Sequence, residues 1–292
     1  MDSYHDFITE WVGVFERAKA IPRGQAPIQE RLAVGGPKPP KALIFSPHPD
    51  DECIIGGLPL RLMRELGMDV VNVAVTQGSR KDRQDERWEE LCNACDYLGF
   101  GLVQTGPGGL ENVNIKTREN DYDRWFQSVE VIAGILEEHE PAVVFTPHED
   151  DWNSTHIGTS LLVVDALREM ESAFSCLFVE TEFWGAMSEP NLMVESSPKD
   201  VGDLVTALSF HEGEVNRNPY HLRLPAWMQD NVRRGSELVG GQGGASPDFV
   251  FATLYRLQKW EESMLTEVLE GGTQLSHEAD LKELFPFTKS GK

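Results

Sequence analysis

The stretch ALIFSPHPDDEC, residues 42–53, decides how the rest of the chain is read. It begins as an apolar run typical of a buried strand and turns at once into HPDDE (48–52), one imidazole with three carboxylates. Like charges this close repel one another and lose hydration, so such a cluster usually serves a cation or a reaction. We therefore expect a functional site directly after this strand, although acidic residues there also act simply as caps of a following helix.

Apolar runs and helical patterns alternate after this point. Strands are expected at 42–47, 70–76, 100–106, 142–148 and 176–184, and helices at about 55–66, 82–98, 121–139 and 155–171. This alternation predicts βαβ units. The expected fold is therefore α/β and Rossmann-like, with a mostly parallel sheet, right-handed crossovers and helices on both faces.

The N-terminal part has a different pattern. Residues 2–20 place apolar side chains at helical spacing, and prolines and glycines follow up to Pro40. We predict an arm helix and linker at 1–40, and a Rossmann-like catalytic domain with a C-terminal extension at 41–292. Within this extension, residues 216–248 are expected to form either a substrate wall or a flexible surface connection. The arm helix is expected either to clamp a neighbouring subunit in a homo-oligomer or to cover its own domain.

Composition excludes several classes of partner. The 292 residues include 48 acidic and 26 basic side chains, a net charge of -22, which argues against nucleic acid because phosphate binding needs clustered Lys and Arg. No apolar run approaches the roughly 18 residues of a membrane span, and the N-terminus does not resemble a secretory signal. A cytoplasmic location is expected. The four cysteines do not suggest a disulfide framework, and Cys92 and Cys95 are read as small residues on a helix face.

A second polar cluster, HEDDWNSTH (148–156), follows the strand predicted at 142–148. The carboxyl ends of parallel strands share one edge of a sheet, where ligands bind, so the two clusters should meet there. Two imidazoles with one carboxylate favour a catalytic zinc site, although iron(II) or another borderline divalent ion fits as well. Asp50 is best placed as a base beside such a metal, and Glu52 as a residue that holds a ligand or starts the next helix.

The motifs resemble those of a known family. The quoted motifs are PHPDDE (47–52), TQG (76–78), the helix pattern from Arg87 through Glu90, Ala94 and Leu98 to Gly99, TPHEDDWNSTHIGT (146–159), ETEFW (180–184) and ALSFHEGEV (207–215). Over about residues 41–215 the chain resembles the PIG-L/LmbE-like deacetylases, zinc-dependent enzymes on a Rossmann-like fold that remove acyl groups from N-acetylglucosamine-type amino sugars.

The resemblance implies roles for individual residues. It makes His48, Asp51 and His156 the zinc ligands, with one ion per chain, and Asp50 the general base. Asn153 stands where relatives often have a histidine that stabilises the oxyanion, so this role falls to His148 or His211, and the sequence does not choose between them. The residues expected to bind substrate are Arg87, Trp184 and Tyr220.

Together these observations predict a metal-dependent hydrolase that removes the N-acetyl group from a small-molecule amino sugar or its conjugate. Three alternatives stay open. An amidase of a larger N-acyl conjugate, a thiol-sugar or a glycolipid, would release another acid. A metal-dependent phosphoesterase would hold two ions. A non-catalytic sugar- or metabolite-binding protein is disfavoured because both polar clusters are present and no G-x-G-x-x-G follows the first strand.

Overall fold

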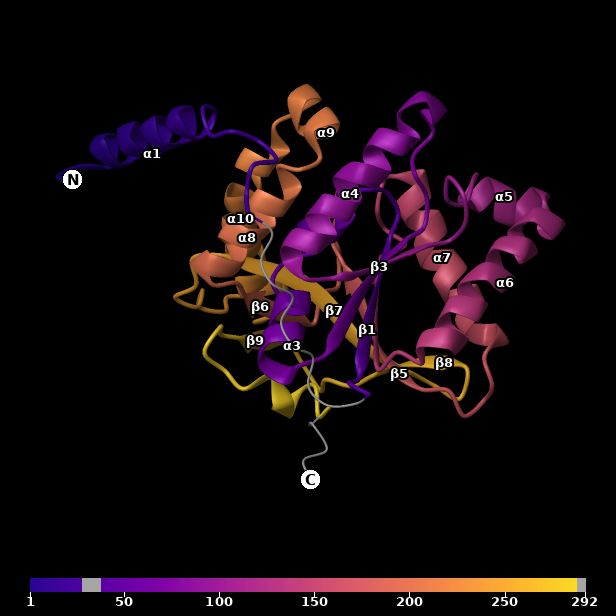
Figure 1. Cartoon of the computed structure of the whole chain (residues 1–292). Coiled ribbons are helices and arrows are strands. Elements are labelled where there is room, and N and C mark those ends of the chain that lie inside the picture. The colour runs from indigo at the N-terminus through magenta and orange to yellow at the C-terminus, as the bar shows by residue number, and fades with distance from the viewer. Residues whose placement is uncertain (28–37, 288–292) are drawn as a thin grey trace.

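A nine-stranded sheet runs through the computed structural model, which describes residues 1–27 and 38–287 (Figure 1). Its strands follow the order β3-β2-β1-β4-β5-β7-β6-β9, and β8 pairs with β7. The strands are β1 Lys41–Ser46, β2 Asp69–Ala74, β3 Gly101–Gln104, β4 Val143–Pro147, β5 Cys176–Thr181, β6 Leu192–Glu195, β7 Ala252–Glu261, β8 Met264–Glu267 and β9 Thr273–Leu275. The five strands β1 to β5 are mutually parallel, which confirms the predicted fold class.

Helices cover both faces of this sheet. The helices of the described residues are α1 Tyr4–Ala18, α2 Asp51–Ile54, α3 Leu58–Leu66, α4 Gln84–Leu98, α5 Ile115–Asn120, α6 Tyr122–His139, α7 Ser154–Glu169, α8 Pro198–Leu208, α9 Glu212–Arg217 and α10 Leu224–Leu238, with the short 3₁₀ helices η1 Lys81–Arg83, η2 Tyr220–Leu222 and η3 Leu281–Glu283. Alternate residues of a strand point to opposite faces. Accordingly, Ala42 and Ile44 of β1 join a core with α3, α4 and α8, whereas Leu43 and Phe45 join a core with α6 and α7.

The helix predicted at 55–66 is two helices. α2 ends at Ile54, and α3 begins only at Leu58 because Gly56 takes a positive φ of 89° that breaks the first helix. A Cβ at Gly56 would lie 2.2 Å from Thr253 Oγ1, so β7 packs too closely there for any side chain. α3 then closes at Gly67, which takes the left-handed conformation common at helix C-termini.

The C-terminal part contains elements that the pattern did not predict. β7 lies between β5 and β6 and is antiparallel to both. It adds to the β5 edge of the parallel sheet a strand of opposite polarity. The segment 216–248, expected as a substrate wall or a flexible connection, contains η2 and the 15-residue helix α10. α10 packs on β7 through a small core that includes Val232 and Leu254.

The predicted arm helix is α1, and it extends away from the body of the molecule (Figure 1). Its N-cap Ser3 accepts a hydrogen bond from the backbone of Asp6, and none of its residues is buried. Near its C-terminal end, the guanidinium of Arg223 lies 5.3 Å from the centre of the Phe15 ring. Part of the predicted linker, residues 28–37, lies outside the described residues. Within the described residues, no helix combines the length and apolar character that a membrane crossing requires.

The topology places the two polar clusters side by side. β1 and β4 are neighbouring parallel strands, with Leu43 opposite Val144. The loops that leave their carboxyl ends, HPDD (48–51) and the segment 148–153, therefore begin at the same edge of the sheet. The predicted convergence of the two clusters is confirmed.

Candidate functional site

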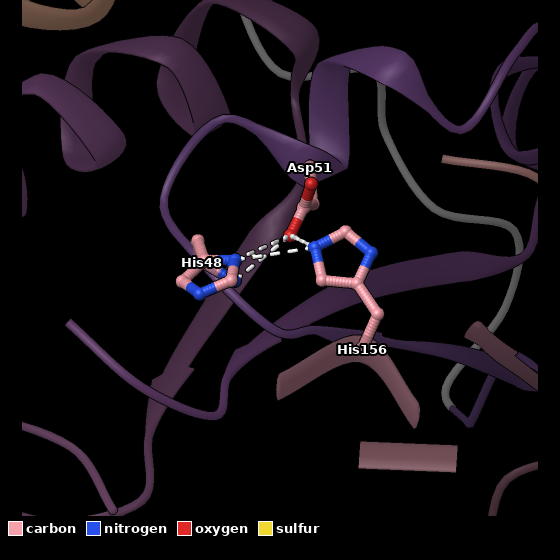
Figure 2. Close-up of side chains that lie close together, drawn as sticks. All are labelled: His48, Asp51 and His156. Atoms are coloured by element: carbon pink, nitrogen blue, oxygen red, sulfur yellow. Dashed lines mark hydrogen bonds and ion pairs between the residues drawn. The ribbon is translucent and has the colours of Figure 1, made fainter. Parts of the chain in front are cut away.

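His48, Asp51 and His156 converge at this edge (Figure 2). His48 lies in the turn after β1, Asp51 begins α2, and His156 lies in the first turn of α7. Their candidate ligand atoms all lie within 4.8 Å of one another. Asp51 and His156 are completely buried, and one carboxylate oxygen of Asp51, Oδ1, has no hydrogen-bond partner among the residues that the structure describes.

The spacing of these three groups fits one divalent ion. His48 Nδ1 lies 3.2 Å from His156 Nε2, and Asp51 Oδ2 lies 3.5 Å from His48 Nδ1 and 3.4 Å from His156 Nε2. Tetrahedral ligands about 2.0–2.1 Å from zinc stand roughly 3.3–3.4 Å apart. The donor set, two imidazoles and one carboxylate, is the kind found in catalytic zinc sites. The residues present therefore fit a metal ion, and they would be its protein ligands.

Asp151 supports His156 from behind. Its Oδ2 lies 3.3 Å from His156 Nδ1 and accepts the backbone N–H of Gly185 at 3.1 Å, while Oδ1 accepts that of Asn153 at 2.8 Å. Burial works to raise the pKa of Asp151, but the hydrogen bonds from His156 and Asn153 lower it to about 2. A carboxylate on the far nitrogen of a metal-binding imidazole fixes its tautomer and increases its basicity. The sequence grouped Asp151 with the second cluster but did not give it this role.

Asp50 stands beside the cluster in an unusual backbone conformation, with φ of 114°. Its backbone N–H donates to Glu52 Oε2 at 3.0 Å, and Tyr220 donates its hydroxyl hydrogen bond to Asp50 Oδ2. Arg87 donates to the carbonyl oxygen of Pro49 at 3.0 Å. Strained turns of this kind persist only where surrounding groups over-determine them, and they are frequent at active sites. Burial, with the negative charge of Asp51 second, raises the pKa of Asp50 to about 7.

Glu52, Cys53 and His211 form a second cluster that is entirely buried. Glu52 Oε1 lies 2.7 Å from His211 Nε2 and accepts the Cys53 thiol at 3.1 Å. Burial and the charge of Glu52 raise the pKa of Cys53 well above its ordinary value, so this thiol stays neutral and is a poor metal ligand. The cluster holds the turn of Asp50 in place through Glu52, which lies in the first turn of α2.

Two cavities adjoin at the candidate metal site and share His48, Gly78 and Ser79. The smaller cavity has a volume of about 330 Å³, and its wall includes Leu110, Asn112, Val113, Asn114 and Thr155. The larger cavity has a volume of about 550 Å³, and its wall includes Asp50, Trp152, Asn153 and Trp184 together with Arg80, Arg83, Arg87 and Arg217.

The remaining residues predicted for the site occupy different places. Trp184 lines the larger cavity, and its ring lies 5.4 Å from that of Tyr220 and 6.5 Å from that of Trp152. Arg87 also lines it, although its guanidinium donates to backbone carbonyls of the loops around it. His148 and His211 are buried and line neither of these cavities. His148 Nε2 lies 3.0 Å from the carbonyl oxygen of Gly185.

The loop that carries Trp184 is fixed by a helix from the C-terminal extension. Arg234 of α10 contacts both carboxylate oxygens of the buried Glu182, at 2.9 and 2.7 Å. Glu182 also accepts the backbone N–H of Met187 at 2.6 Å. This pair could not be predicted from the sequence, because its members stand 52 positions apart.

Comparison with known proteins agrees with this fold. Residues 43–167 match the family described as PIG-L, GlcNAc-PI de-N-acetylase. No curated protein sequence matches the chain. Several solved structures, by contrast, match the fold of this chain.

The N,N'-diacetylchitobiose deacetylase of Pyrococcus horikoshii is 14% identical, with a TM-score of 0.53 over 88% of this chain and 93% of that one. A zinc-inhibited form of teicoplanin deacetylase is 16% identical, with a TM-score of 0.52 over 78% and 100%. The 4-carboxy-2-hydroxymuconate hydratase of Pseudomonas putida KT2440 is 17% identical, with a TM-score of 0.54 over 75% and 95%.

At such identities the similarity establishes the fold alone, and the presence of a hydratase beside deacetylases illustrates that one fold carries several reactions. The family match covers the stretch from the first strand to the end of the helix that bears His156, and so contains all three candidate ligands. Over residues 43–167 this chain is therefore similar to the PIG-L family.

Proposed function

We propose that this protein is a metal-dependent hydrolase that removes the N-acetyl group from an N-acetylglucosamine-type amino sugar or its conjugate. The observation that carries the proposal is the convergence of His48, Asp51 and His156 beside Asp50 at the wall of a cavity. The PIG-L family match supports the deacetylase class. Zinc is the proposed ion, and another divalent transition metal suits the same donors.

The reaction breaks the amide C–N bond and joins the oxygen of water to the acyl carbon. A divalent ion held by the three ligands supplies a Lewis acid for the carbonyl group and favours ionisation of water near neutral pH. Asp50 accepts the proton that water loses, and it donates a proton to the departing amine nitrogen. The products are acetate and the free amine.

Several residues prepare Asp50 for this duty. The backbone turn fixed by Glu52 and Arg87 holds its carboxylate at the cavity wall, and the hydroxyl of Tyr220 holds Oδ2. Tyr220 thus acts on Asp50, in addition to any contact with substrate through its ring. Asp151 likewise orients the imidazole of His156.

The donor for the developing oxyanion is proposed to be Asn153. Its side chain caps α7 through Oδ1, which accepts the backbone N–H of Thr155 at 2.9 Å, and the residue lines the larger cavity. Because His148 and His211 line neither cavity, their proposed roles are to support the loop of Gly185 and the turn of Asp50. Trp152 and Trp184 offer ring faces for a sugar.

The other proposals concern the whole chain. Residues 41–292 are proposed to form one domain, because β7 and β6 continue the sheet begun by β1 to β5, and residues 1–40 are proposed to be an arm. A cytoplasmic location is proposed from the composition, with a small-molecule partner and no nucleic acid.

The direct test is acetate release from a set of N-acetyl amino sugars, with and without chelator and added Zn²⁺. Replacement Asp50→Asn should reduce turnover by about 100-fold or more while the metal content stays unchanged. Release of a longer acid from larger conjugates, without acetate release, would favour the amidase alternative. Release of phosphate, with two ions per chain, would favour the phosphoesterase.

A further inference from the structure

The two cavities differ in their position relative to the proposed base, Asp50. Asp50 lines the larger cavity and is absent from the lining of the smaller one. In the proposed mechanism the residue that protonates the departing amine must reach its nitrogen. The amine half of the substrate therefore lies in the larger cavity. The acyl half is left to the smaller cavity, between Leu110, Val113 and Thr155.

The larger cavity is basic in a protein that is strongly acidic. Four arginines line it, against two acidic residues, Asp50 and Glu214, whereas the whole chain has a net charge of -22. We call these four residues, Arg80, Arg83, Arg87 and Arg217, the arginine wall. Because Lys and Arg are outnumbered almost two to one in the sequence, their concentration at this cavity is a property of the site.

The acidic side chains near the arginine wall do not saturate it. Glu214 is the shared partner of three of its members: Oε1 lies 3.1 Å from Arg83 Nη1 and 3.9 Å from Arg87 Nε, and Oε2 lies 2.5 Å from Arg217 Nη2. Arg80 pairs with Asp82 at 2.6 Å, and Arg83 also pairs with Glu86 at 3.5 Å. Three carboxylates therefore face the four guanidinium groups. Two buried nitrogens of the wall, Arg83 Nη2 and Arg87 Nε, have no hydrogen-bond partner within residues 1–27 and 38–287.

Two glycines make room for the buried guanidinium groups. A Cβ at Gly213 would lie 1.6 Å from Arg83 Nη2, and a Cβ at Gly78 would lie 2.2 Å from Arg87 Nη1. These arginines thus pack directly on backbone, held in fixed positions. Arg80 and Arg217, by contrast, leave 69% and 74% of their side chains exposed at the cavity and can turn toward a ligand. The wall combines fixed charge with adaptable donors.

We infer that the amine half of the substrate is an amino sugar that carries an anionic group, a phosphate or a carboxylate, bound by the arginine wall. This inference rests on the proposed function, which supplies the amino sugar and the orientation. Both anions match the planar fork of a guanidinium, which donates two parallel hydrogen bonds. Trp152 and Trp184, in the same cavity, offer faces for the sugar ring. Lys81 and Glu111 line the smaller cavity and pair with each other at 2.8 Å, so the charges there balance and the acyl half needs none.

The kinetic test compares three substrates with the zinc-loaded full-length chain. N-acetylglucosamine 1-phosphate carries the anion on the amine half, N-acetylglucosamine carries none, and N-succinylglucosamine carries it on the acyl half. The first is expected to have a kcat/KM about tenfold or more above the second, with most of the difference in KM. The preference should shrink at about 0.5 M salt. The kcat/KM for N-succinylglucosamine should not exceed that for N-acetylglucosamine.

Matched variants identify the residues. Arg217→Gln should remove most of the preference for the phosphate-bearing substrate over the neutral one. The control is Arg233→Gln, because Arg233 is 73% exposed and pairs with Asp230 three positions away, as Arg217 pairs with Glu214. Arg233 belongs to neither cavity, so its replacement should leave the preference intact.

A binding measurement separates this inference from the proposed function. Glucosamine 1-phosphate should bind the zinc-loaded chain about tenfold tighter than glucosamine in a calorimetric titration, and Arg217→Gln should abolish the difference. If acetate is released from neutral and anionic sugars with equal kcat/KM, and both amines bind equally, the inference is overturned while the proposed function stands. If no amino sugar yields acetate, the proposed function fails, and the inference about its substrate fails with it.

Discussion

Tyr220 donates its hydroxyl hydrogen bond to Asp50 Oδ2 across 170 positions of the sequence. The contact joins η2, outside the segment that matches the PIG-L family, to the turn after β1. Burial, followed by the charge of Asp50, raises the pKa of Tyr220, so this hydroxyl stays protonated and remains a donor. The C-terminal extension therefore completes the arrangement around the proposed base.

Replacement Tyr220→Phe tests this contact. Loss of a hydrogen bond to a charged group should lower kcat by about tenfold, because Asp50 then loses its fixed orientation. KM should change little, since the phenyl ring still packs on Trp184. Steady-state kinetics on an N-acetyl amino sugar give both constants. An unchanged kcat would show that the hydroxyl does not act through Asp50.

Asp151 is expected to determine metal affinity although it is not a proposed ligand. Replacement Asp151→Asn removes the carboxylate behind His156 and should weaken metal binding by about 10- to 100-fold. Competition with a chromophoric chelator measures the affinity. Asp150→Asn is the matched control, because Asp150 is exposed and accepts a hydrogen bond from Ser188 instead. Equal affinities of the two variants would contradict the supporting role.

The pair Arg234–Glu182 should contribute strongly to stability. Glu182 is completely buried, so Arg234→Met leaves an uncompensated carboxylate in the interior and should cost about 3–5 kcal/mol of unfolding free energy. Arg233→Met, at the adjacent exposed pair, should cost within about 0.5 kcal/mol. Urea denaturation followed by far-UV circular dichroism compares them. Similar urea midpoints for both variants would contradict the predicted contribution of Arg234 to stability.

Stability should also depend on pH through Asp165. Burial works to raise the pKa of this carboxyl, but hydrogen bonds from Arg118 and Trp125 hold it below the ordinary value of 3.8. A carboxyl whose pKa is depressed by folding stabilises the folded state fully above its unfolded pKa. That contribution is lost as the pH falls below about 4, through the folded pKa. The difference in unfolding free energy between the wild type and Asp165→Asn should therefore be constant near neutral pH and shrink on acidification. A difference that grows on acidification would refute this sign.

The fold around the site could be predicted well from the sequence, because strongly apolar strands alternate with long helices from Lys41 to Thr181. The pattern also located the clusters of His48 and His156 at one edge, since parallel strands that follow helices end on the same side. Local spacing is sufficient for such features, because the strand and its polar turn are contiguous in the chain.

Features that depend on distant contacts could not be predicted in this way. Tyr220 lies in a segment without clear periodicity, and nothing in the sequence pairs it with Asp50 or pairs Arg234 with Glu182. The antiparallel strand β7 was missed, because its place between β5 and β6 is set by packing after a long excursion through α8, α9 and α10. The burial of His148 and His211 follows likewise from tertiary contacts with Gly185 and Glu52.

The most direct test of the metal centre is the metal content of purified protein, measured by inductively coupled plasma mass spectrometry for the wild type and for His156→Ala. His156→Ala removes a buried proposed ligand. We predict about one divalent transition metal ion per chain in the wild type and a content near zero in the variant after the same dialysis. A wild type without bound metal, or a variant that retains as much as the wild type, would contradict it.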